Sequence, residues 1–389
     1  MSKIKVVDAL CGAGKTSAAI NLINSSTGKF LFITPLLSEV QRIKESCPDK
    51  HFLEPESRGS KLHDVKRLFQ KGRNIVTTHA LFELFCEDVV DIIKEQGYTL
   101  IIDESLNVIE QYPMYHKDVK LLCNGLIDVR ENGLAVWRDK YYEGIFSDLK
   151  SLCDNQRICV YMNSALLQIL PVSVFTAFQD IYLLTYMFDC QIIRYYFDLY
   201  RLSYRHIYVK DGHFTLEPVQ YNNSSYVDLI HIVEHAKLNE IGENKYALSK
   251  SWFEHKPDDV DQLRKNLVNY YRKIACVPTA KTLWTTYKTY QDALVGKGYQ
   301  TTFLACNARA TNDYVDRVAL AYALNRYANP IIRRYFQQHN ITLDEDGMAL
   351  SEMIQWVFRS AVRQEQPVSI YVPSKRMRDL MQNWLDSLI

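Results

Sequence analysis

The sequence lacks several features that would assign it to a broad class of protein. Its nine cysteines include no Cys-x-x-Cys pair, so we expect reduced core thiols and no zinc or iron–sulfur site. No apolar run approaches the roughly 18 residues that a membrane span needs. The first residues lead directly into a strand pattern, without an export signal. These absences predict a cytoplasmic protein with no membrane partner.

An excess of charge of one sign is also missing. The formal net charge is +1, so the overall charge does not indicate a nucleic-acid partner. A nucleic-acid site would have to be a local groove whose basic residues are balanced elsewhere. No internal repeat or low-complexity tract is visible. The chain of 389 residues is long enough for two ordinary domains, each with its own core.

Short apolar runs alternate with helical patterns, which predicts an α/β fold with parallel sheets and crossover helices. In the first half, the strand candidates are residues 4–7, 30–33, 74–76, 99–102, 158–162 and 180–184. Residues 111–155 are less regular, and we interpret them as helical decoration. In the second half, strands are expected at 282–286, 302–304 and 368–372, and helices at 260–273, 290–295, 317–335 and 349–363. The economical division is a first domain of residues 1–200 and a second of residues 201–389, which begins with a hairpin at an Asp211-Gly212 turn.

The most informative segment is Ala9-Leu10-Cys11-Gly12-Ala13-Gly14-Lys15-Thr16, which lies between a strand pattern and a helix pattern. Backbone N–H groups of such a turn point at one anion, and the lysine adds a mobile positive charge. The threonine hydroxyl then binds the magnesium ion that bridges the phosphates. The segment predicts a site for ATP and Mg²⁺. Its expected nucleotide-binding residues are Gly12, Ala13, Gly14, Lys15, Thr16 and Ser17.

Two carboxylates follow a second aliphatic run, in Leu100-Ile101-Ile102-Asp103-Glu104-Ser105. A buried strand that ends this way delivers its acids to the edge of the sheet where α/β proteins bind ligands. We expect Asp103 to hold the magnesium ion together with Thr16. Glu104 is then expected to orient and deprotonate the attacking water. A solvated strand end explains many such pairs, but the preceding phosphate loop favours a triphosphate site.

Small hydroxyl residues follow two other strand candidates. Thr34-Pro35 comes directly after the second, and Thr77-Thr78-His79 directly after the third. Such groups bind the phosphates of a polymer without reading its sequence, although threonine at these positions also caps helices. Both interpretations stay open.

This series of motifs resembles motifs I, Ia, Ic and II of the superfamily 2 helicases, with Asp103-Glu104-Ser105 as motif II. Segments similar to the later motifs follow in the same order, with Leu183–Phe188 as III, Leu283–Thr286 as IV and Asn307–Asp313 as V. Motif II is not Asp-Glu-Ala-Asp, and no glutamine motif precedes the phosphate loop, so the DEAD-box RNA helicases are a poorer match. The chain resembles compact phage-encoded members of the superfamily, and more distantly the viral origin-binding helicases.

Motif VI, Gln-x-x-Gly-Arg-x-x-Arg, has a counterpart in the segment from Gln355 to Arg363. Gln355, Arg359 and Arg363 recur every four residues and would share one face of a helix. A row of two guanidinium groups suits a γ-phosphate, whose transition-state charge an arginine finger stabilises. A surface arginine stripe is the alternative. The pattern leaves open which arginine is the finger.

The resemblance implies two RecA-like P-loop lobes with an ATP cleft between them. It implies single-stranded or forked nucleic acid as the substrate, with DNA favoured and with replication or recombination proteins as partners, in the host cytoplasm for a phage-encoded chain. The implied nucleic-acid contacts are Thr34, Pro35, Thr77, Thr78, His79, Thr285 and Arg309. We therefore expect an ATP-dependent helicase or translocase. Two alternatives are an ATP-controlled clamp and a terminase-like packaging ATPase, for which Asp344, Glu345 and Asp346 are the nearest acidic cluster.

Overall fold

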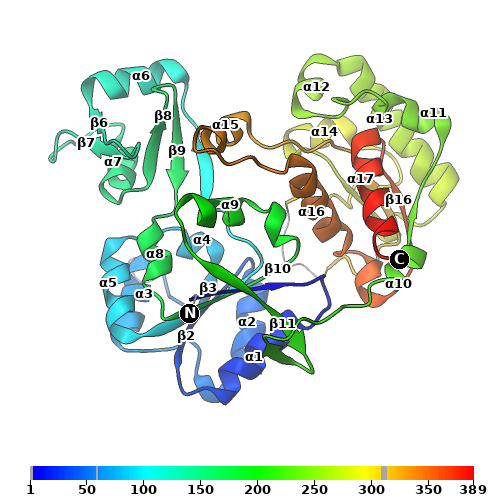
Figure 1. The fold of residues 1–389 in the computed structure, drawn as a ribbon. Coiled ribbons are helices and arrows are strands. Elements are labelled where there is room, and N and C mark those ends of the chain that lie inside the picture. The colour runs from blue at the N-terminus through cyan, green and yellow to red at the C-terminus, as the bar shows by residue number, and fades with distance from the viewer. Residues whose placement is uncertain (1–2, 58–59, 308–312) are drawn as a thin grey trace. The chain divides into compact units, whose positions relative to one another are not determined.

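The computed structural model describes residues 3–57, 60–307 and 313–389 (Figure 1). The chain forms two compact units, and both are discontinuous in sequence. The first unit consists of residues 1–9, 14–219 and 329–343, and the second of residues 10–13, 220–328 and 344–389. The chain is therefore an α/β protein that crosses between its units several times, rather than once as the predicted boundary at 200/201 implied.

The first unit is built on a sheet in the order β12-β11-β1-β10-β4-β2-β3. All neighbouring strands run parallel except β12 against β11. The strands are β1 (Ile4–Asp8), β2 (Lys29–Thr34), β3 (Ile75–Thr78), β4 (Tyr98–Asp103), β10 (Asp180–Thr185), β11 (Tyr204–Lys210) and β12 (His213–Thr215). The helices around them are α1 (Lys15–Ser25), α2 (Leu37–Ser46), α3 (Lys61–Gln70), α4 (His79–Phe82), α5 (Glu87–Gln96), α8 (Val172–Thr176) and α9 (Ile192–Leu199).

Helices cover both faces of this sheet. Successive side chains of each strand point to opposite faces, and the side chains of both faces are apolar and need to be buried. Ile101 of β4 faces a core that contains Ala18 and Ile23 of α1. Tyr98 of the same strand points to the other face, where its ring makes an edge contact with Phe69 of α3 at 4.8 Å. Ile101 and Tyr98 are both fully buried. A strand buried on both faces explains why β4 reads as a continuous aliphatic run.

The predicted hairpin at residues 204–215 exists, but it belongs to the first sheet. Strand β11 lies beside β1, with Ile4 opposite Tyr204 and Val7 opposite Ile207. Val209 of β11 is buried against the α1 face of the sheet. The segment thus extends the sheet of the first unit and is not an insertion in the second.

Residues 109–169 form a separate subdomain within the first unit, where the sequence predicted helical decoration. Its strands are β5 (Ile109–Tyr112), β6 (Ile127–Val129), β7 (Ala135–Trp137), β8 (Ile158–Tyr161) and β9 (Ala165–Ile169), and its helices are α6 (His116–Gly125) and α7 (Ser147–Asp154). Strand β8 pairs antiparallel with β9, in the order β5-β9-β8. The prediction that residues 158–162 join the parallel sheet is therefore wrong, because a short apolar run does not specify its partner.

Helix α15 (Pro330–Gln338) comes from much later in the chain but packs on this subdomain (Figure 1). The amide Nδ2 of Asn329 donates to Oε1 of Gln111 in β5 at 3.0 Å. The Tyr335 ring meets the Tyr161 ring of β8, with centroids 6.1 Å apart. These contacts explain why residues 329–343 group with the first unit.

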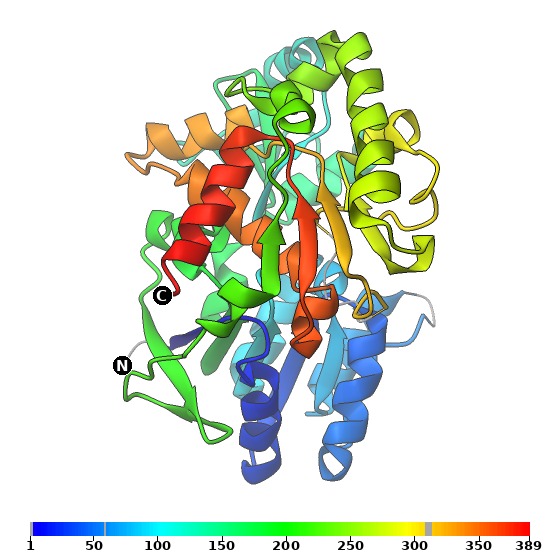
Figure 2. The same cartoon turned by 90° about the vertical axis from the view of Figure 1, so that its right-hand side faces the viewer.

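The second unit is built on a parallel sheet in the order β13-β16-β15-β14, visible in Figure 2. The strands are β13 (Ile230–Ile232), β14 (Thr282–Thr285), β15 (Ala319–Tyr322) and β16 (Val368–Tyr371). The α-helices are α10 (Ser225–Leu229), α11 (Ala236–Asn239), α12 (Lys250–His255), α13 (Pro257–Asn269), α14 (Gln291–Leu294), α16 (Glu345–Val357) and α17 (Lys375–Asp386). Its core contains the buried rings of Tyr270, Tyr271 and Trp284.

Two predictions for this unit are corrected. Strand β15 lies in a segment that was predicted as part of a helix over residues 317–335, because its alanines and leucine suit either structure. Residues 302–304 contribute only a bridge between Phe303 and Trp284 instead of a strand.

Within the described ranges, no helix combines the length and apolar character that a bilayer crossing requires. The same ranges contain no cluster of three or more histidine, cysteine, aspartate or glutamate side chains able to hold a metal ion.

Candidate active site

The glycine-rich segment connects β1 to α1. Gly12 and Gly14 have φ angles of 93° and 76°, which glycine adopts without strain. A Cβ on Gly14 would find its nearest atom, Val209 Cγ1, at 3.9 Å, so conformation rather than space requires glycine there. Gly14 is the N-cap of α1, and among the described residues no side chain caps this helix. The start of α1 therefore lies directly after the glycine-rich turn, the arrangement in which helix N–H groups bind an anion.

Two side chains of the first turn of α1 connect the loop to the neighbouring strands. Lys15 Nζ donates to the carbonyl oxygen of Ala9 at 2.5 Å. Thr16 Oγ1 donates to Asp103 Oδ1 at 3.2 Å. The hydroxyl and the carboxylate that were predicted to share a magnesium ion are therefore in direct contact, although 87 positions separate them in the sequence.

The end of β4 holds both predicted carboxylates at the carboxyl edge of the sheet. Asp103 lies opposite Leu184 of β10, and the backbone N–H of Glu104 donates to the Leu184 carbonyl oxygen at 2.9 Å. Glu104 has a φ of 65°, a left-handed conformation that is costly for a residue with a side chain. Such strain concentrates at functional sites.

Burial raises the pKa of Asp103 to about 6, and the nearby Glu104 carboxylate adds to this effect. Lys15 and the hydrogen bond from Thr16 oppose the shift, while Glu39 of α2 adds to it more weakly. An ionised Asp103 is therefore destabilised in the absence of a cation. A divalent cation beside Thr16 and Asp103 would relieve this cost, so the donor set fits Mg²⁺.

Asp8, which immediately precedes the glycine-rich loop, is a further residue of the site that the sequence motifs did not indicate. Its carboxylate accepts two backbone hydrogen bonds, from Met187 N at 2.7 Å and from Phe188 N at 2.9 Å. Met187 has a φ of 57°, so these bonds hold a strained turn at the end of β10. Burial raises the pKa of Asp8, and the two N–H donors oppose that shift. The sequence signal that could have indicated Asp8 is its position as an acidic residue at the end of the first strand, directly before the glycine-rich segment.

The same turn contains Thr185, the residue of the predicted motif III. Its hydroxyl donates to Gln191 Oε1 at 2.8 Å, and Gln191 Nε2 donates to the Tyr186 carbonyl oxygen at 2.8 Å. The Ala9 N–H donates to the Thr185 carbonyl oxygen at 3.1 Å. Asp8 and Thr185 therefore attach the β10 turn to the start of the glycine-rich loop, and Gln191 stabilises the turn itself.

The predicted polymer contacts of the first unit lie together at one edge, since Thr34 is opposite Thr78 in neighbouring strands. Thr34, Thr77 and His79 are nevertheless buried, with exposed fractions of 0%, 3% and 6%. Pro35 and Thr78 are partly exposed. The geometry thus leaves Pro35 and Thr78 accessible and places the other three side chains in the interior.

The structure does not bring Gln355, Arg359 and Arg363 onto one helical face. Helix α16 ends at Val357, and Ser360 is extended, with its Oγ donating to the Val357 carbonyl oxygen at 2.5 Å. Arg359 is buried, whereas Arg363 is exposed in a 3₁₀ turn. Gln355 Nε2 donates within the helix to Ser351 Oγ at 3.0 Å. The prediction of a shared helical face is wrong. The four-residue spacing holds in the sequence, but the helix ends before it reaches Arg359 and Arg363.

Two other predicted residues of the second half give less information. Thr285 ends β14 and is fully buried. Arg309 lies outside the described residues.

The basic residues at the start of α17 form ion pairs within the second unit. Arg376 contacts Asp346 at 2.5 Å, Arg378 contacts Glu243 at 3.1 Å, and Lys375 contacts Asp379 at 2.6 Å. Arg376 Nη1 also donates to Asn325 Oδ1 at 2.9 Å. Arg376 and Arg378 thus attach the start of α17 to neighbouring segments of the unit, whereas the Lys375 pair lies within the helix.

The chain is similar over its whole length to the SPbeta prophage-derived uncharacterized protein YonV of Bacillus subtilis (strain 168). The two are 38% identical over 408 residues, which cover 100% of each chain. Residues 224–385 match the family model of the YonV C-terminal Rossmann-like domain, which agrees with the parallel sheet of the second unit. Residues 109–168 match the YonV middle domain, the subdomain that contains β5 to β9.

Among solved structures, the chain is similar to that of S. tokodaii Xpd4, with a TM-score of 0.50 and 11% identity over 98% of this chain and 94% of that one. At this identity the similarity shows a helicase-like fold alone. Structures of a DEAD box protein from Methanococcus jannaschii and of the DNA-bound DUF1998 helicase MrfA match with TM-scores of 0.26 and 0.34, which are too low to support an argument.

Proposed function

Because the chain belongs to the YonV family, whose Bacillus subtilis member is described as uncharacterized, we propose its function from its own site. We propose that it is a magnesium-dependent ATP hydrolase of helicase type that moves along nucleic acid. The observation that carries the proposal is the contact of Thr16 Oγ1 with Asp103 Oδ1 at 3.2 Å beside the glycine-rich loop. The hydroxyl and the carboxylate are the donors that a magnesium–triphosphate complex uses.

Each residue near this contact has a distinct role in the proposal. The N–H groups at the start of α1, after Gly14, bind the β- and γ-phosphates, and Lys15 moves from the Ala9 carbonyl oxygen to the phosphate oxygens. Thr16 and Asp103 would hold the magnesium ion, which when bound would supply positive charge beside the phosphates. Glu104 orients water for attack on the γ-phosphate and accepts its proton. Arginine assistance from Arg359 or Arg363 stays a prediction from sequence.

The β10 turn supports the further proposal of movement along a polymer. Asp8 and Thr185 join this turn to the loop that binds the phosphates, so a change in the loop on hydrolysis would shift the turn. Pro35 and Thr78 offer accessible groups at the same edge of the sheet for a sugar–phosphate backbone. Single-stranded or forked DNA is the favoured substrate.

Hydrolysis assays test the nucleotide site. We expect Lys15→Ala to abolish phosphate release from ATP, because the phosphate-neutralising charge is lost. Glu104→Gln should retain ATP binding and lower kcat by roughly a hundredfold or more. Lys71→Ala, at an exposed position of the same unit, is the matched control and should behave as wild type. Undiminished hydrolysis by Lys15→Ala would overturn the site assignment.

A second assay separates movement from an ATP-controlled clamp, which would use the same nucleotide site. Strand displacement from a forked duplex that depends on ATP supports the helicase proposal. ATP-dependent affinity for DNA without displacement would favour the clamp.

The packaging ATPase is disfavoured by the contacts of its acidic cluster. Asp344 caps α16 through Gly347 N at 2.9 Å, Asp346 pairs with Arg376, and Glu345 accepts from Ala328 N at 3.2 Å. All three carboxylates thus have structural partners. Magnesium-dependent cleavage of plasmid DNA would restore that alternative.

A further inference from the structure

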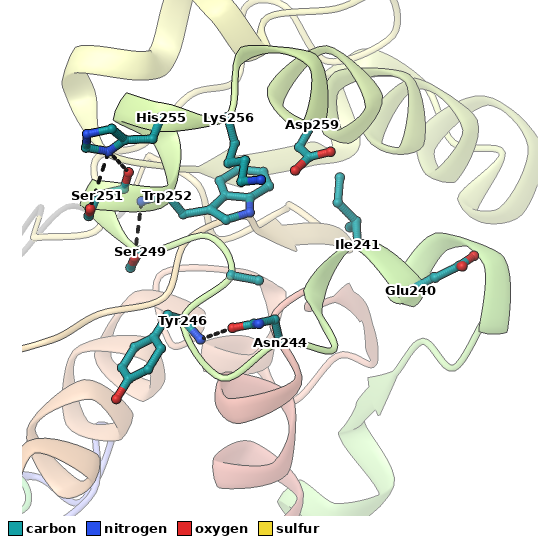
Figure 3. Close-up of a pocket in the computed structure, with 11 residues that line it drawn as sticks. Glu240, Ile241, Asn244, Tyr246, Ser249, Ser251, Trp252, His255, Lys256 and Asp259 are labelled. Carbon is teal, nitrogen blue, oxygen red and sulfur yellow. Dashed lines mark hydrogen bonds between the residues drawn. The ribbon is translucent and has the colours of Figure 1, made fainter.

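A pocket of about 680 Å³ lies in the second unit, and none of the residues that line it belongs to the proposed nucleotide site (Figure 3). Its size falls within the roughly 300–1,000 Å³ of typical ligand sites. The side chains that matter for the argument come from neighbouring short elements. They are Glu240 of the 3₁₀ turn Glu240–Gly242, Asn244 and Tyr246 of the following loop, Trp252 of α12, Lys256, and Asp259 of α13.

The loop that forms one wall is held at the carboxyl edge of the parallel sheet, where α/β proteins bind ligands. Asn325, three residues after β15, donates from Nδ2 to the carbonyl oxygens of Lys245 and Ala247, both at 3.0 Å. Gly242 lies so close to Pro373, after β16, that a Cβ on Gly242 would overlap the Pro373 carbonyl oxygen. The wall is therefore fixed before any ligand binds, which lowers the entropy cost of binding.

Trp252 gives the pocket an aromatic surface. The other four tryptophans of the chain are buried, whereas Trp252 is partly exposed. Its ring stands edge-on to Phe253, with centroids 5.0 Å apart and an interplanar angle of 88°, so the packing holds it in place. Tyr246 adds a second aromatic side chain, 60% exposed. A ring held this way suits a flat π-system, because stacking costs little further order.

The charged groups of the pocket narrow the choice of ligand. Lys256, Glu240 and Asp259 form no ion pair with the described residues, and two more exposed lysines, Lys245 and Lys250, flank the loop. Unpaired ammonium groups beside an aromatic surface suit the phosphates of a single strand whose bases stack. The carboxylates accept hydrogen bonds only, so they suit a base with an exocyclic amino group.

We propose that this pocket binds a base of single-stranded nucleic acid, stacked on Trp252 with its amino edge toward Asp259 and its phosphate near Lys256. The proposal rests on the nucleic-acid function proposed above and adds to it a specific contact in the second unit. A duplex is excluded as the ligand, because its bases are already stacked and paired. The same contact gives a preference for cytosine, adenine or guanine over thymine.

The test uses the full chain without ATP and a labelled oligodeoxycytidylate of about 12 nucleotides. We expect the oligonucleotide to quench tryptophan emission saturably. An abasic strand of the same length should bind about tenfold more weakly. Trp252→Ala should weaken binding of the labelled strand by about tenfold in fluorescence anisotropy, and Trp252→Phe by less, because phenylalanine still stacks. Tyr141→Ala, which removes an aromatic side chain 83% exposed in the first unit, is the matched control.

Equal affinity for the normal and abasic strands, or wild-type affinity in Trp252→Ala, would overturn the inference. Quenching by an oligolysine peptide but not by the oligonucleotide would assign the pocket to a basic protein segment and overturn it as well. Hydrolysis of ATP by the same preparations separates the two proposals. If ATP hydrolysis depends on Lys15 but Trp252→Ala binds the strand like wild type, only the pocket inference is wrong. If the wild-type protein neither hydrolyses ATP nor binds the strand, the proposed function is contradicted.

Discussion

At the scale of single residues, the site depends on a carboxylate whose ionised form is destabilised by burial in the folded protein. Asp103 contacts Thr16 and lies beside Glu104, and its pKa is raised to about 6 from an ordinary value near 3.8. Between these values the folded state binds more protons than the unfolded state. Stability of the metal-free protein therefore falls as the pH rises from about 4 to about 6.

We predict that Asp103→Asn stabilises the metal-free, nucleotide-free protein at neutral pH by roughly 2 kcal/mol, since asparagine keeps the shape without the buried charge. The gain should fall to a few tenths of a kcal/mol near pH 4, where Asp103 is protonated in the folded state and only about half ionised in the unfolded state. Urea unfolding at the two pH values measures it. A gain of equal size at both would show that the charge is not its cause.

Gly242 is a second residue whose identity the fold requires. We predict that Gly242→Ala destabilises the protein by about 2 kcal/mol, because the added Cβ would overlap the Pro373 carbonyl oxygen. Gly125→Ala at the end of α6 is the matched control, since a Cβ there meets nothing within 4 Å. It should be neutral or stabilise by up to about 1 kcal/mol. Similar urea midpoints for the two variants would contradict the close packing at Gly242.

The residues that the sequence predicted best are those whose role depends on local chain geometry. The glycine-rich loop and Asp103 lie where a strand ends, and a strand followed by such a loop and a helix is visible in sequence. The partners of Asp8 could not be found in this way, because Met187 and Phe188 lie 179 and 180 positions further along the chain. Burial of Thr34, Thr77 and His79 was also hidden, since it depends on what packs over the sheet edge.

At the scale of elements, helix α15 is the clearest case of a segment positioned by tertiary contacts. Its Tyr335 is buried beside Tyr161 and Phe336 and lies within the first unit, although the chain enters α15 from the second. The hydrophobic pattern predicted a helix in this region but not where it would pack.

We predict that Tyr335→Ala destabilises the subdomain of residues 109–169 by roughly 3 kcal/mol, because a large buried ring is lost. Amide hydrogen exchange in β8 and β9 should accelerate. Tyr335→Phe keeps the ring and should retain most of the protection. Unchanged exchange in Tyr335→Ala would mean that α15 does not stabilise this subdomain.

Other elements show where periodicity fails. The four-residue spacing of Gln355, Arg359 and Arg363 predicted one helix, but α16 stops at Val357, before both arginines. Strand β15 was hidden in a predicted helix, because Ala319–Tyr322 is short and equally apolar on both faces. Short segments of this kind take their structure from the sheet they join.

At the scale of the whole molecule, the α/β class with parallel sheets follows from the alternation of strands and helices, whereas the order of the strands in each sheet does not. The division of the chain does not, because both units collect residues from distant parts of the sequence. The chain belongs to the YonV family and has a helicase-like fold, and the contact between Thr16 and Asp103 is the chemical basis of the proposed activity.

The most direct test of this account is the rate of magnesium-dependent ATP hydrolysis as single-stranded DNA is added to the purified protein. The account predicts a rate that rises saturably with DNA and is lost in Lys15→Ala. A rate that does not exceed that of Lys15→Ala, with or without DNA, would contradict it.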